Sequence, residues 1–282
     1  VADIDPLTLC LTQQNIQPLL TARTKAVVVV HFGGQAADVS SLRANLPPQV
    51  ALIEDAAHAF GALLPDGRQV GASGNATCFS FYANKNLATG EGGAVALINQ
   101  TLADRLRSLR QHALPIDAWK RFTHASTVML SPGLTELGYK ANYTDLQAAI
   151  GRVQLRRFPQ MTKTRGRLVA RYLERLEPLR AQVKTHQDIG NNSHARHLLT
   201  VEITQQSRLP RDQLLNELRH RNIGATIHYA PLHEMPLYQI GKRQTLPVTE
   251  AVARRILTLP ISASMKPADV DYVCDHLGAL VA

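Results

Sequence analysis

The chain has 282 residues, of which 45% are hydrophobic and 19% are charged, so it can bury a large core. No apolar run approaches the roughly 18 residues that a membrane span needs, and the first residues show neither the basic nor the apolar region of a signal peptide. Composition therefore excludes a disordered or membrane-spanning chain, and we expect a globular protein of the cytoplasm.

The formal net charge of +9 raises the question of nucleic-acid binding. The basic residues gather on segments that carry an apolar stripe and no interleaved aromatic side chains. We interpret them mainly as a solvated helix face, with attraction of a phosphate-bearing substrate as the functional alternative. The residues concerned are Arg152, Arg156, Arg157, Lys163, Arg165, Arg167 and Arg171.

The three cysteines, Cys10, Cys78 and Cys274, are far apart and form no Cys-x-x-Cys pattern. An odd number of scattered thiols argues against a disulfide framework. Neither they nor the eleven histidines have the spacing of a zinc site. We therefore expect buried or incidental thiols and no metal.

The first part of the chain alternates predicted strands and helices. Residues 26–30 and 50–53 are short apolar runs without alternation, which is typical of parallel strands covered on both faces. Residues 77–81 and 93–98 continue this series. An amphipathic helix over about 101–112 follows. This order of elements predicts an α/β domain with a mostly parallel sheet.

The later part of the chain predicts a second domain. Thr144 and Gln147 form a capping box that opens a helix, and we expect Pro159 to end that helix. A long amphipathic helix, a strand over 197–203, and helices after Pro210 and Pro267 follow. We therefore divide the chain into a large domain, 1–159, and a smaller α+β domain, 160–282.

One lysine and one carboxylate carry the strongest functional signal. Asp55 closes the apolar run at 50–53, and Lys85 follows the predicted strand at 77–81. A pyridoxal phosphate enzyme needs an amine that holds the cofactor's aldehyde as a Schiff base and a carboxylate that keeps the pyridine nitrogen protonated. Side chains at the ends of two buried strands can supply both groups.

Five segments in order resemble the DegT/DnrJ/EryC1/StrS family of sugar aminotransferases. The resemblance implies the pyridoxal phosphate fold of type I, like that of aspartate aminotransferase, with pyridoxal 5′-phosphate as cofactor. Within the family, Gly-Tyr-Lys-x-Asn at 138–142 looks most similar to the enzymes that aminate the 4-keto pentose of UDP-linked arabinose for lipopolysaccharide. The segments are residues 54–61, 80–93, 137–145, 224–233 and 255–261.

The resemblance also implies roles for individual residues. Lys85 is the expected Schiff-base lysine and catalytic residue, Asp55 the partner of the pyridine nitrogen, and His58 a contact to the cofactor ring. Ala57 is expected to pack against that ring, and Ser80 to donate to the phosphate.

Three more residues are assigned by the same resemblance. Asn142 is expected to reach the cofactor phosphate from a neighbouring subunit, which implies a homodimer with shared active sites. His228 and Tyr229 are expected near the substrate. The implied activity moves an amino group from an amino acid, glutamate above all, to a keto group of a nucleotide-linked sugar.

Several of these residues have purely structural alternatives. Asp55 could cap a following helix, although an unpaired carboxylate after so apolar a strand would be costly. Ser80 could bond to the backbone, Asn142 could belong to a turn, and His58 could be an ordinary core histidine. The glycines at 90, 92 and 93 suit a turn at the entry to a strand better than a phosphate cradle. The roles of His31, His112 and His233 are left open.

The N-terminal residues resemble a segment from the interior of family members. What precedes it in the family includes a phosphate-binding loop at a helix N-terminus and part of the dimer interface. A non-catalytic homologue that keeps the fold is therefore one alternative function. A pyridoxal phosphate-dependent sugar dehydratase is another, and Lys85 weighs against it because such relatives have histidine at that position.

Overall fold

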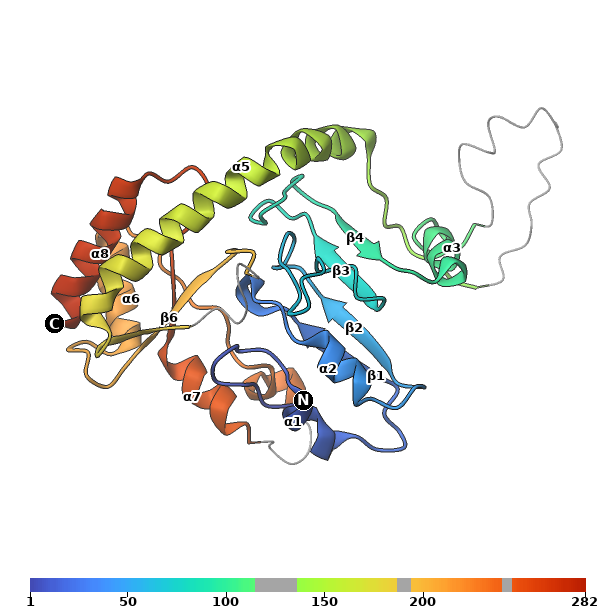
Figure 1. Cartoon of the computed structure of the whole chain (residues 1–282), viewed down its shortest axis with the longest axis horizontal. Coiled ribbons are helices and arrows are strands. Elements are labelled where there is room, and N and C mark those ends of the chain that lie inside the picture. Colours follow the sequence, from blue (N-terminus) through green and yellow to red (C-terminus); the bar gives the residue numbers. More distant parts are fainter. Residues whose placement is uncertain (115–135, 187–193, 240–244) are drawn as a thin grey trace.

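A computed structural model describes residues 1–114, 136–186, 194–239 and 245–282. Two sheets and one long helix organise the chain, and the helix α5 runs along both sheets (Figure 1). In the first sheet the strand order is β1-β2-β3-β4, and in the second it is β5-β6-β7. None of the described helices is long and apolar enough to cross a membrane.

The first sheet is mostly parallel, as predicted. β1 pairs in parallel with β2, and β2 in parallel with β3. β4, expected to continue the series, pairs antiparallel with β3. The reason is the link from 81 to 92, which contains no helix that could carry the chain across the sheet to a parallel position. The strands are β1 (Ala26–Val30), β2 (Ala51–Asp55), β3 (Ala76–Ser80) and β4 (Gly93–Ala96).

β1 corrects the expectation of strands covered on both faces. Val27 and Val29 are buried in the first core, whereas Val28 is 55% exposed and Val30 41% exposed. The outward pair lines a large cavity instead of packing under a helix. The helices of this part of the chain are α1 (Gln13–Ile16), α2 (Val39–Ala44) and α3 (Gln100–Leu109).

A buried carboxylate joins β1 to β2 immediately before Asp55. Glu54 is fully buried, and one oxygen lies 3.0 Å from Nε2 of His31. Its other oxygen accepts hydrogen bonds from Ser73 and, at 2.8 Å, from Asn75. Burial alone would raise the pKa of Glu54, but these hydrogen bonds outweigh it and the pKa is lowered. The network fixes the end of β2 from which Asp55 projects.

Replacing Glu54 by alanine is expected to cost about 3–5 kcal/mol of unfolding free energy, because the buried His31 and the partly buried Ser73 and Asn75 lose their acceptor. Glu54→Gln keeps an oxygen and the volume, so its cost should be smaller. Urea denaturation measures both. Glu177→Ala, at a carboxylate whose side chain is 68% exposed, is the matched control. An equal stability of Glu54→Ala and the control would contradict the role given to this network.

α5 (Asp145–Leu176) begins as predicted but does not end at Pro159. The capping box is present: Gln147 N–H donates to Thr144 Oγ1, and Thr144 N–H donates to Gln147 Oε1 at 2.8 Å. Proline in a helix interior removes a hydrogen bond, but it does not forbid a helix that is held from outside. Here the neighbouring Phe158 ring packs edge-on against Phe60, with ring centroids 5.0 Å apart.

The contact at Phe158 depends on a glycine. Gly61 has φ +86°, and a Cβ at that position would lie 2.5 Å from the Phe158 ring. Glycine alone therefore allows the ring to approach the backbone this closely. Tertiary contact of this kind explains why the pattern around Pro159 predicted a helix end that the fold overrides.

Most of the basic face of α5 is solvated, although the partly buried Arg171 pairs with Asp271. Arg152, Arg156, Arg157 and Lys163 are exposed, as expected. Arg165 is not: it is only 9% exposed and donates to the Arg196 carbonyl at 3.0 Å. A guanidinium can be buried when backbone carbonyls accept hydrogen bonds from it. The hydrogen bond of Arg165 holds the helix against the segment that enters the second sheet.

The second sheet and its helices form a core of their own. Tyr172 and Leu176 of α5 pack with Leu214, Leu257 and Leu277 in this core. The helices that follow Pro210 and Pro267 are confirmed, and the predicted strand at 197–203 is shorter than expected. The elements are β5 (Val183–Thr185), β6 (Leu199–Ile203), α6 (Arg211–His220), α7 (Pro247–Arg255), β7 (Ile256–Leu259) and α8 (Pro267–Val281).

The two cores support a proposed division into two domains, although the predicted boundary at 159/160 falls inside α5. A small third cluster, in which Leu9 packs with Val252 and Ile256, joins the N-terminal segment to α7. The N-terminal segment is also tied to α7 by Asp3, which accepts hydrogen bonds from Val248 and Thr249. The candidate site lies where these parts meet.

Candidate functional site

Asp55 and Lys85 follow the carboxyl ends of neighbouring parallel strands. Asp55 is the last residue of β2, and Lys85 lies in the link after β3, where its N–H donates to the Tyr82 carbonyl at 3.0 Å. β2 and β3 are paired in parallel, so both side chains emerge at the same edge of the sheet. Within the described residues the Lys85 ammonium forms no salt bridge, but it interacts electrostatically with Asp55.

Asp55 does not cap a helix. Its Oδ1 accepts the Ala57 N–H at 3.0 Å, which makes a tight turn two residues long, and residues 56–61 form turns with no helix. This single bond leaves the second carboxylate oxygen available. The half-buried carboxylate can therefore accept a proton-bearing partner from the cavity beside it.

A cavity of about 620 Å³ brings residues from both parts of the chain together. Asp55, Ala57 and His58 line it from the first sheet, and His228 and Tyr229 line it from the segment after α6. Five of the eight residues assigned from sequence thus line one cavity. Lys85, Ser80 and Asn142 do not line this cavity.

His58 is held in one tautomer by its two hydrogen bonds. Its Nδ1 accepts the Gly33 N–H at 3.3 Å, so the ring proton of the neutral imidazole is on Nε2. Nε2 lies 3.1 Å from Tyr229 Oη, which accepts that proton and keeps its own hydroxyl proton free to donate. His58 is only 9% exposed, and its two hydrogen bonds come from different parts of the chain: Gly33 follows β1, and Tyr229 follows α6.

Burial lowers the pKa of two side chains at the site. Burial lowers the pKa of Lys85, and the nearby Asp55 carboxylate opposes that shift in part. Burial lowers the pKa of His58 to about 4, and the positive charge of Lys85 adds to the effect. At neutral pH, His58 is therefore an uncharged ring, and Lys85 gives up its proton more readily than an exposed lysine does.

The low pKa of His58 predicts how stability depends on pH. Between its ordinary value of 6.5 and its folded value of about 4, the unfolded chain binds a proton on His58 that the folded chain does not. Stability attributable to this residue is complete above pH 6.5 and falls on acidification by up to about 3 kcal/mol. His58→Phe should therefore flatten the stability curve over this interval, measured by urea unfolding at several pH values.

The matched control for this measurement is His220→Phe, because the His220 side chain is 78% exposed. That variant should keep the slope of the unmodified chain. An unchanged slope in His58→Phe would contradict the neutral, buried state of His58.

Ser80 and Asn142 are not among the residues that line the cavity. Ser80 ends β3, and its oxygen accepts the Tyr82 N–H at 3.3 Å. The proton of the Ser80 hydroxyl has no acceptor among the described residues. Asn142 is exposed and precedes α5. Its predicted role concerns a neighbouring subunit, so a single chain does not test it.

Two residues beside the site had no signal in the sequence. His197 packs against His58 with ring centroids 4.6 Å apart, and its Nδ1 lies 3.3 Å from Oδ1 of Asn86. Asn86 directly follows Lys85 and belongs to a segment already quoted for the family resemblance. A histidine at the start of a predicted strand has no recognisable spacing, so only the fold reveals this contact.

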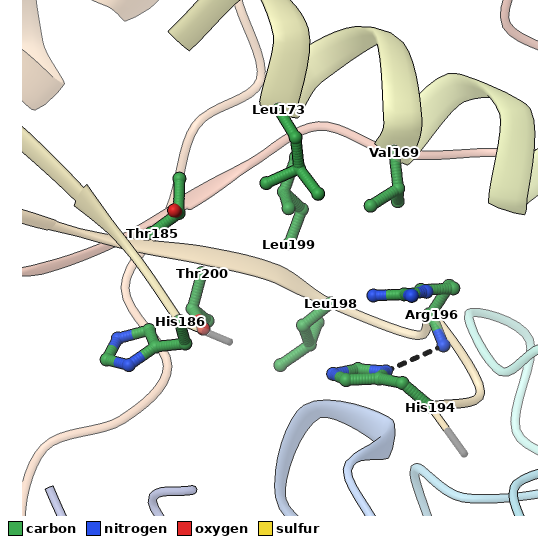
Figure 2. Close-up of a pocket in the computed structure, with 9 residues that line it drawn as sticks. All are labelled: Val169, Leu173, Thr185, His186, His194, Arg196, Leu198, Leu199 and Thr200. Carbon is green, nitrogen blue, oxygen red and sulfur yellow. Dashed lines mark hydrogen bonds between the residues drawn. The ribbon is translucent and has the colours of Figure 1, made fainter. Parts of the chain in front are cut away.

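A second cavity of about 350 Å³ lies at the side of β6, away from the assigned residues (Figure 2). His194 and Arg196 face it from one side and His186 from the other. The Nδ1 atom of His194 accepts the Arg196 N–H at 2.9 Å. None of the residues assigned to a cofactor or substrate lines this second cavity.

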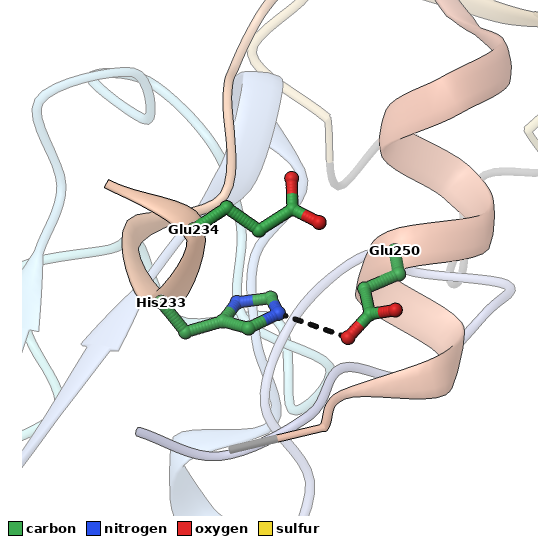
Figure 3. Close-up of side chains that lie close together, drawn as sticks. All are labelled: His233, Glu234 and Glu250. Carbon is green, nitrogen blue, oxygen red and sulfur yellow. Dashed lines mark hydrogen bonds and ion pairs between the residues drawn. The ribbon is translucent and has the colours of Figure 1, made fainter. Parts of the chain in front are cut away.

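His233, left open by the sequence, forms a pair with Glu250 of α7. His233 Nε2 lies 3.2 Å from Glu250 Oε1, and Glu234 lies beside them (Figure 3). The carboxylate of Glu250 also accepts the Leu246 N–H at 3.2 Å and contacts Arg254. Because protein donors already satisfy Glu250, the pair serves to hold the segment after His228 and Tyr229 against α7.

The residues of the site fit pyridoxal phosphate chemically. An amine with lowered pKa suits the aldehyde, a half-buried carboxylate suits the ring nitrogen, and a serine hydroxyl with a free proton suits the phosphate. The amine of Lys85 and the carboxylate of Asp55 are also electrostatically coupled.

Comparison with known proteins agrees with this chemistry. A model of the DegT/DnrJ/EryC1/StrS aminotransferase family matches residues 1–278. The spore coat polysaccharide biosynthesis protein SpsC of Bacillus subtilis is 36% identical over 288 residues, which cover 99% of this chain and 72% of SpsC.

Two solved structures share the fold. DesV of S. venezuelae, determined in complex with a ketimine intermediate, has a TM-score of 0.83 and 30% identity, covering 97% of this chain and 70% of DesV. DesI, determined in the presence of its TDP-sugar product, has a TM-score of 0.86 and 31% identity, covering 98% of this chain and 67% of DesI. They confirm the predicted α/β fold of type I. The chain belongs to the DegT/DnrJ/EryC1/StrS aminotransferase family.

Proposed function

We propose that this protein is a pyridoxal 5′-phosphate-dependent aminotransferase that moves an amino group from glutamate to a keto group of a nucleotide-linked sugar. One observation carries the proposal: Lys85 and Asp55 are electrostatically coupled at the same edge of the first sheet, next to a cavity that both parts of the chain line. Family membership supports the aminotransfer, and the geometry supplies the groups for it.

When bound, the cofactor supplies an aldehyde that carries the amino group and an electron-withdrawing ring. Lys85 would hold that aldehyde covalently and would be freed by the amino group of the substrate. The free amine of Lys85 would then move a proton between the substrate's α-carbon and the former aldehyde carbon. Its lowered pKa increases the fraction of neutral amine that can act as this base.

Other side chains are proposed to hold the cofactor in place beside Lys85. Asp55 would keep a proton on the ring nitrogen, and its hydrogen bond from Ala57 N–H fixes the direction of the carboxylate. The neutral His58 would contact the ring without adding a charge, and Ser80 would donate to the phosphate. The same residues serve the second half-reaction, in which the keto sugar receives the amino group.

The sugar class rests on relatives and on the second wall of the cavity. DesI was determined with a TDP-sugar product, and SpsC is named for polysaccharide biosynthesis. In this chain His228 and Tyr229 line the same cavity as Asp55, and their polar groups can bond to sugar hydroxyls. We assign them to the substrate, and a likeness to the UDP-arabinose type stays a prediction.

We further propose a homodimer that acts in the cytoplasm. Asn142 is exposed, as a residue that serves a neighbouring subunit must be. The start of α5 presents Leu146, Ile150 and Val153 at helical spacing, and they are 80%, 49% and 45% exposed. An apolar stripe of this kind suits burial against a second copy.

Adding pyridoxal phosphate to the purified chain tests the proposal. We expect a visible absorption band, which borohydride bleaches while fixing the cofactor on Lys85, as peptide mapping will show. Incubation with glutamate and a nucleotide-linked keto sugar should then yield the amino sugar and 2-oxoglutarate. A colourless chain that does not respond to the cofactor would favour the non-catalytic homologue instead.

A further inference from the structure

A short segment before β6 crosses from the second sheet to the site. Residues 195–198, which we call the crossing segment, bond to the loop after β1: Ala195 N–H donates to Gly34 O at 2.8 Å and Leu198 N–H to Gly33 O at 2.9 Å. Gly34 has φ +106°, and a Cβ there would lie 3.2 Å from the Ala195 Cβ. The contact is therefore close enough to require glycine.

Asn86 ties the crossing segment to the backbone that carries Lys85. Its amide nitrogen donates to the Ala195 carbonyl at 2.7 Å. Because only the amide NH₂ can donate to a carbonyl, Oδ1 is the atom that faces His197 Nδ1 at 3.3 Å. That oxygen can only accept, so the His197 proton lies on Nδ1.

His197 in turn packs on His58. The two rings are 4.6 Å apart and inclined by 38°, and His197 is 7% exposed. Burial is the main cause that lowers the pKa of His197 to about 2, and the positive charges of Lys85 and Arg165 and of the protonated forms of His58 and His228 add to it. A ring that stays neutral and is bonded on one side acts by holding its neighbours and moves no proton itself.

We propose that His197 and Asn86 are positioning residues of the aminotransfer site: through the crossing segment they fix the His58 ring relative to the backbone that carries Lys85. This inference rests on the proposed function, since it concerns the ring contact and the amine of that reaction. Neither residue reaches the reacting atoms. Their effect is exerted through His58 and Lys85.

A first test uses the cofactor-free protein, so that it is independent of the proposed activity. In ¹⁵N-histidine NMR, His197 should show the Nδ1–H tautomer and His58 the Nε2–H tautomer, with His197→Phe assigning the signals. Asn86→Ala should shift His197 toward Nε2–H, whereas Asn86→Asp keeps an acceptor and should retain Nδ1–H. An Nε2–H tautomer in the unmodified protein, or no change in Asn86→Ala, would overturn the proposal.

A second test measures turnover. His197→Phe keeps a ring but loses the donor, and Asn86→Ala loses both contacts; each should lower kcat by about 10- to 100-fold with KM changed far less, because misplacement acts on the reacting geometry. Asn45→Ala, an exposed asparagine, and His220→Phe are the controls and should keep wild-type rates. Wild-type kcat in both test variants would refute positioning.

The two tests separate the proposals. An unmodified protein that binds no cofactor but shows the expected tautomers leaves the positioning contacts established and the proposed function wrong. Thermal unfolding of each variant identifies loss of the fold, and Asn86→Asp then decides, because it should restore the His197 tautomer and part of kcat.

Discussion

Lys85→Ala is expected to lower aminotransfer by at least about 10³-fold, because one side chain supplies both the covalent attachment and the proton transfer. Lys85→Arg should be equally inactive, since a guanidinium keeps its proton at any relevant pH. With Asp55 and Ser80 in their proposed roles, a pyridoxal phosphate titration followed by fluorescence should show weaker, reversible binding that borohydride no longer fixes.

Lys163→Ala is the matched control for this loss. Lys163 is exposed on α5, so its removal should leave turnover and borohydride fixation as they are in the unmodified protein. Rates within a few-fold of wild type in Lys85→Ala would sink the assignment of this lysine, and labelling of a different lysine would relocate the site.

Asp55→Asn should produce the second large effect. The amide keeps an oxygen for the Ala57 N–H, so the turn survives, but the negative charge opposite the ring nitrogen is lost. We expect kcat to fall by about 10²-fold or more, as is typical when one electrostatic contact to the reacting system is removed. Single-turnover kinetics with glutamate measures this fall directly.

A second readout of Asp55→Asn does not need the cofactor. The Asp55 carboxylate opposes the lowering of the Lys85 pKa, so removing its charge should lower that pKa further. The pH dependence of Lys85 acylation in the cofactor-free chain reports this shift. Asp104→Asn, at a carboxylate 60% exposed, should change neither quantity. A Lys85 pKa that rises in Asp55→Asn would show that the two groups are not coupled as described.

Local patterns predicted the elements that local physics decides. The apolar runs gave β1, β2 and β3, and the capping box at Thr144 gave the start of α5, because pleat, periodicity and cap chemistry all lie within a few residues. Pro210 and Pro267 marked helix starts for the same reason: a proline's missing N–H has no partner to lose there.

Features decided by distant parts of the chain were not predictable. Pro159 signals a helix end, but contacts of Phe158 with Phe60 and Gly61 hold the helix through it. Arg165 looks like its exposed neighbours in sequence, yet carbonyls from Arg196 and Ile261 surround it. Both outcomes depend on segments 30 or more positions away.

The candidate site divides in the same way. Lys85, Asp55, His58 and Ala57 could be assigned because their motifs are local and resemble a family. Glu54, Asn86 and His197 support them, and Glu54 and Asn86 lie inside the segments that resemble the family, but no spacing or residue type marks the contacts that these three side chains make. Their roles appear only when β1, β2 and the crossing segment are brought together.

The long helix α5 contacts both parts of the chain. The helix of 32 residues spans about 48 Å at 1.5 Å per residue, with its first half against Phe60 and its second half built into the core with α8. Pro159 interrupts the hydrogen-bond ladder near the middle, which is where such a helix bends most easily. A bend of about 5° there displaces the far end by about 2 Å. Direct hydrogen bonds, such as that between Tyr229 and His58, also join the two parts of the chain, so α5 shares with them the task of keeping the parts in place.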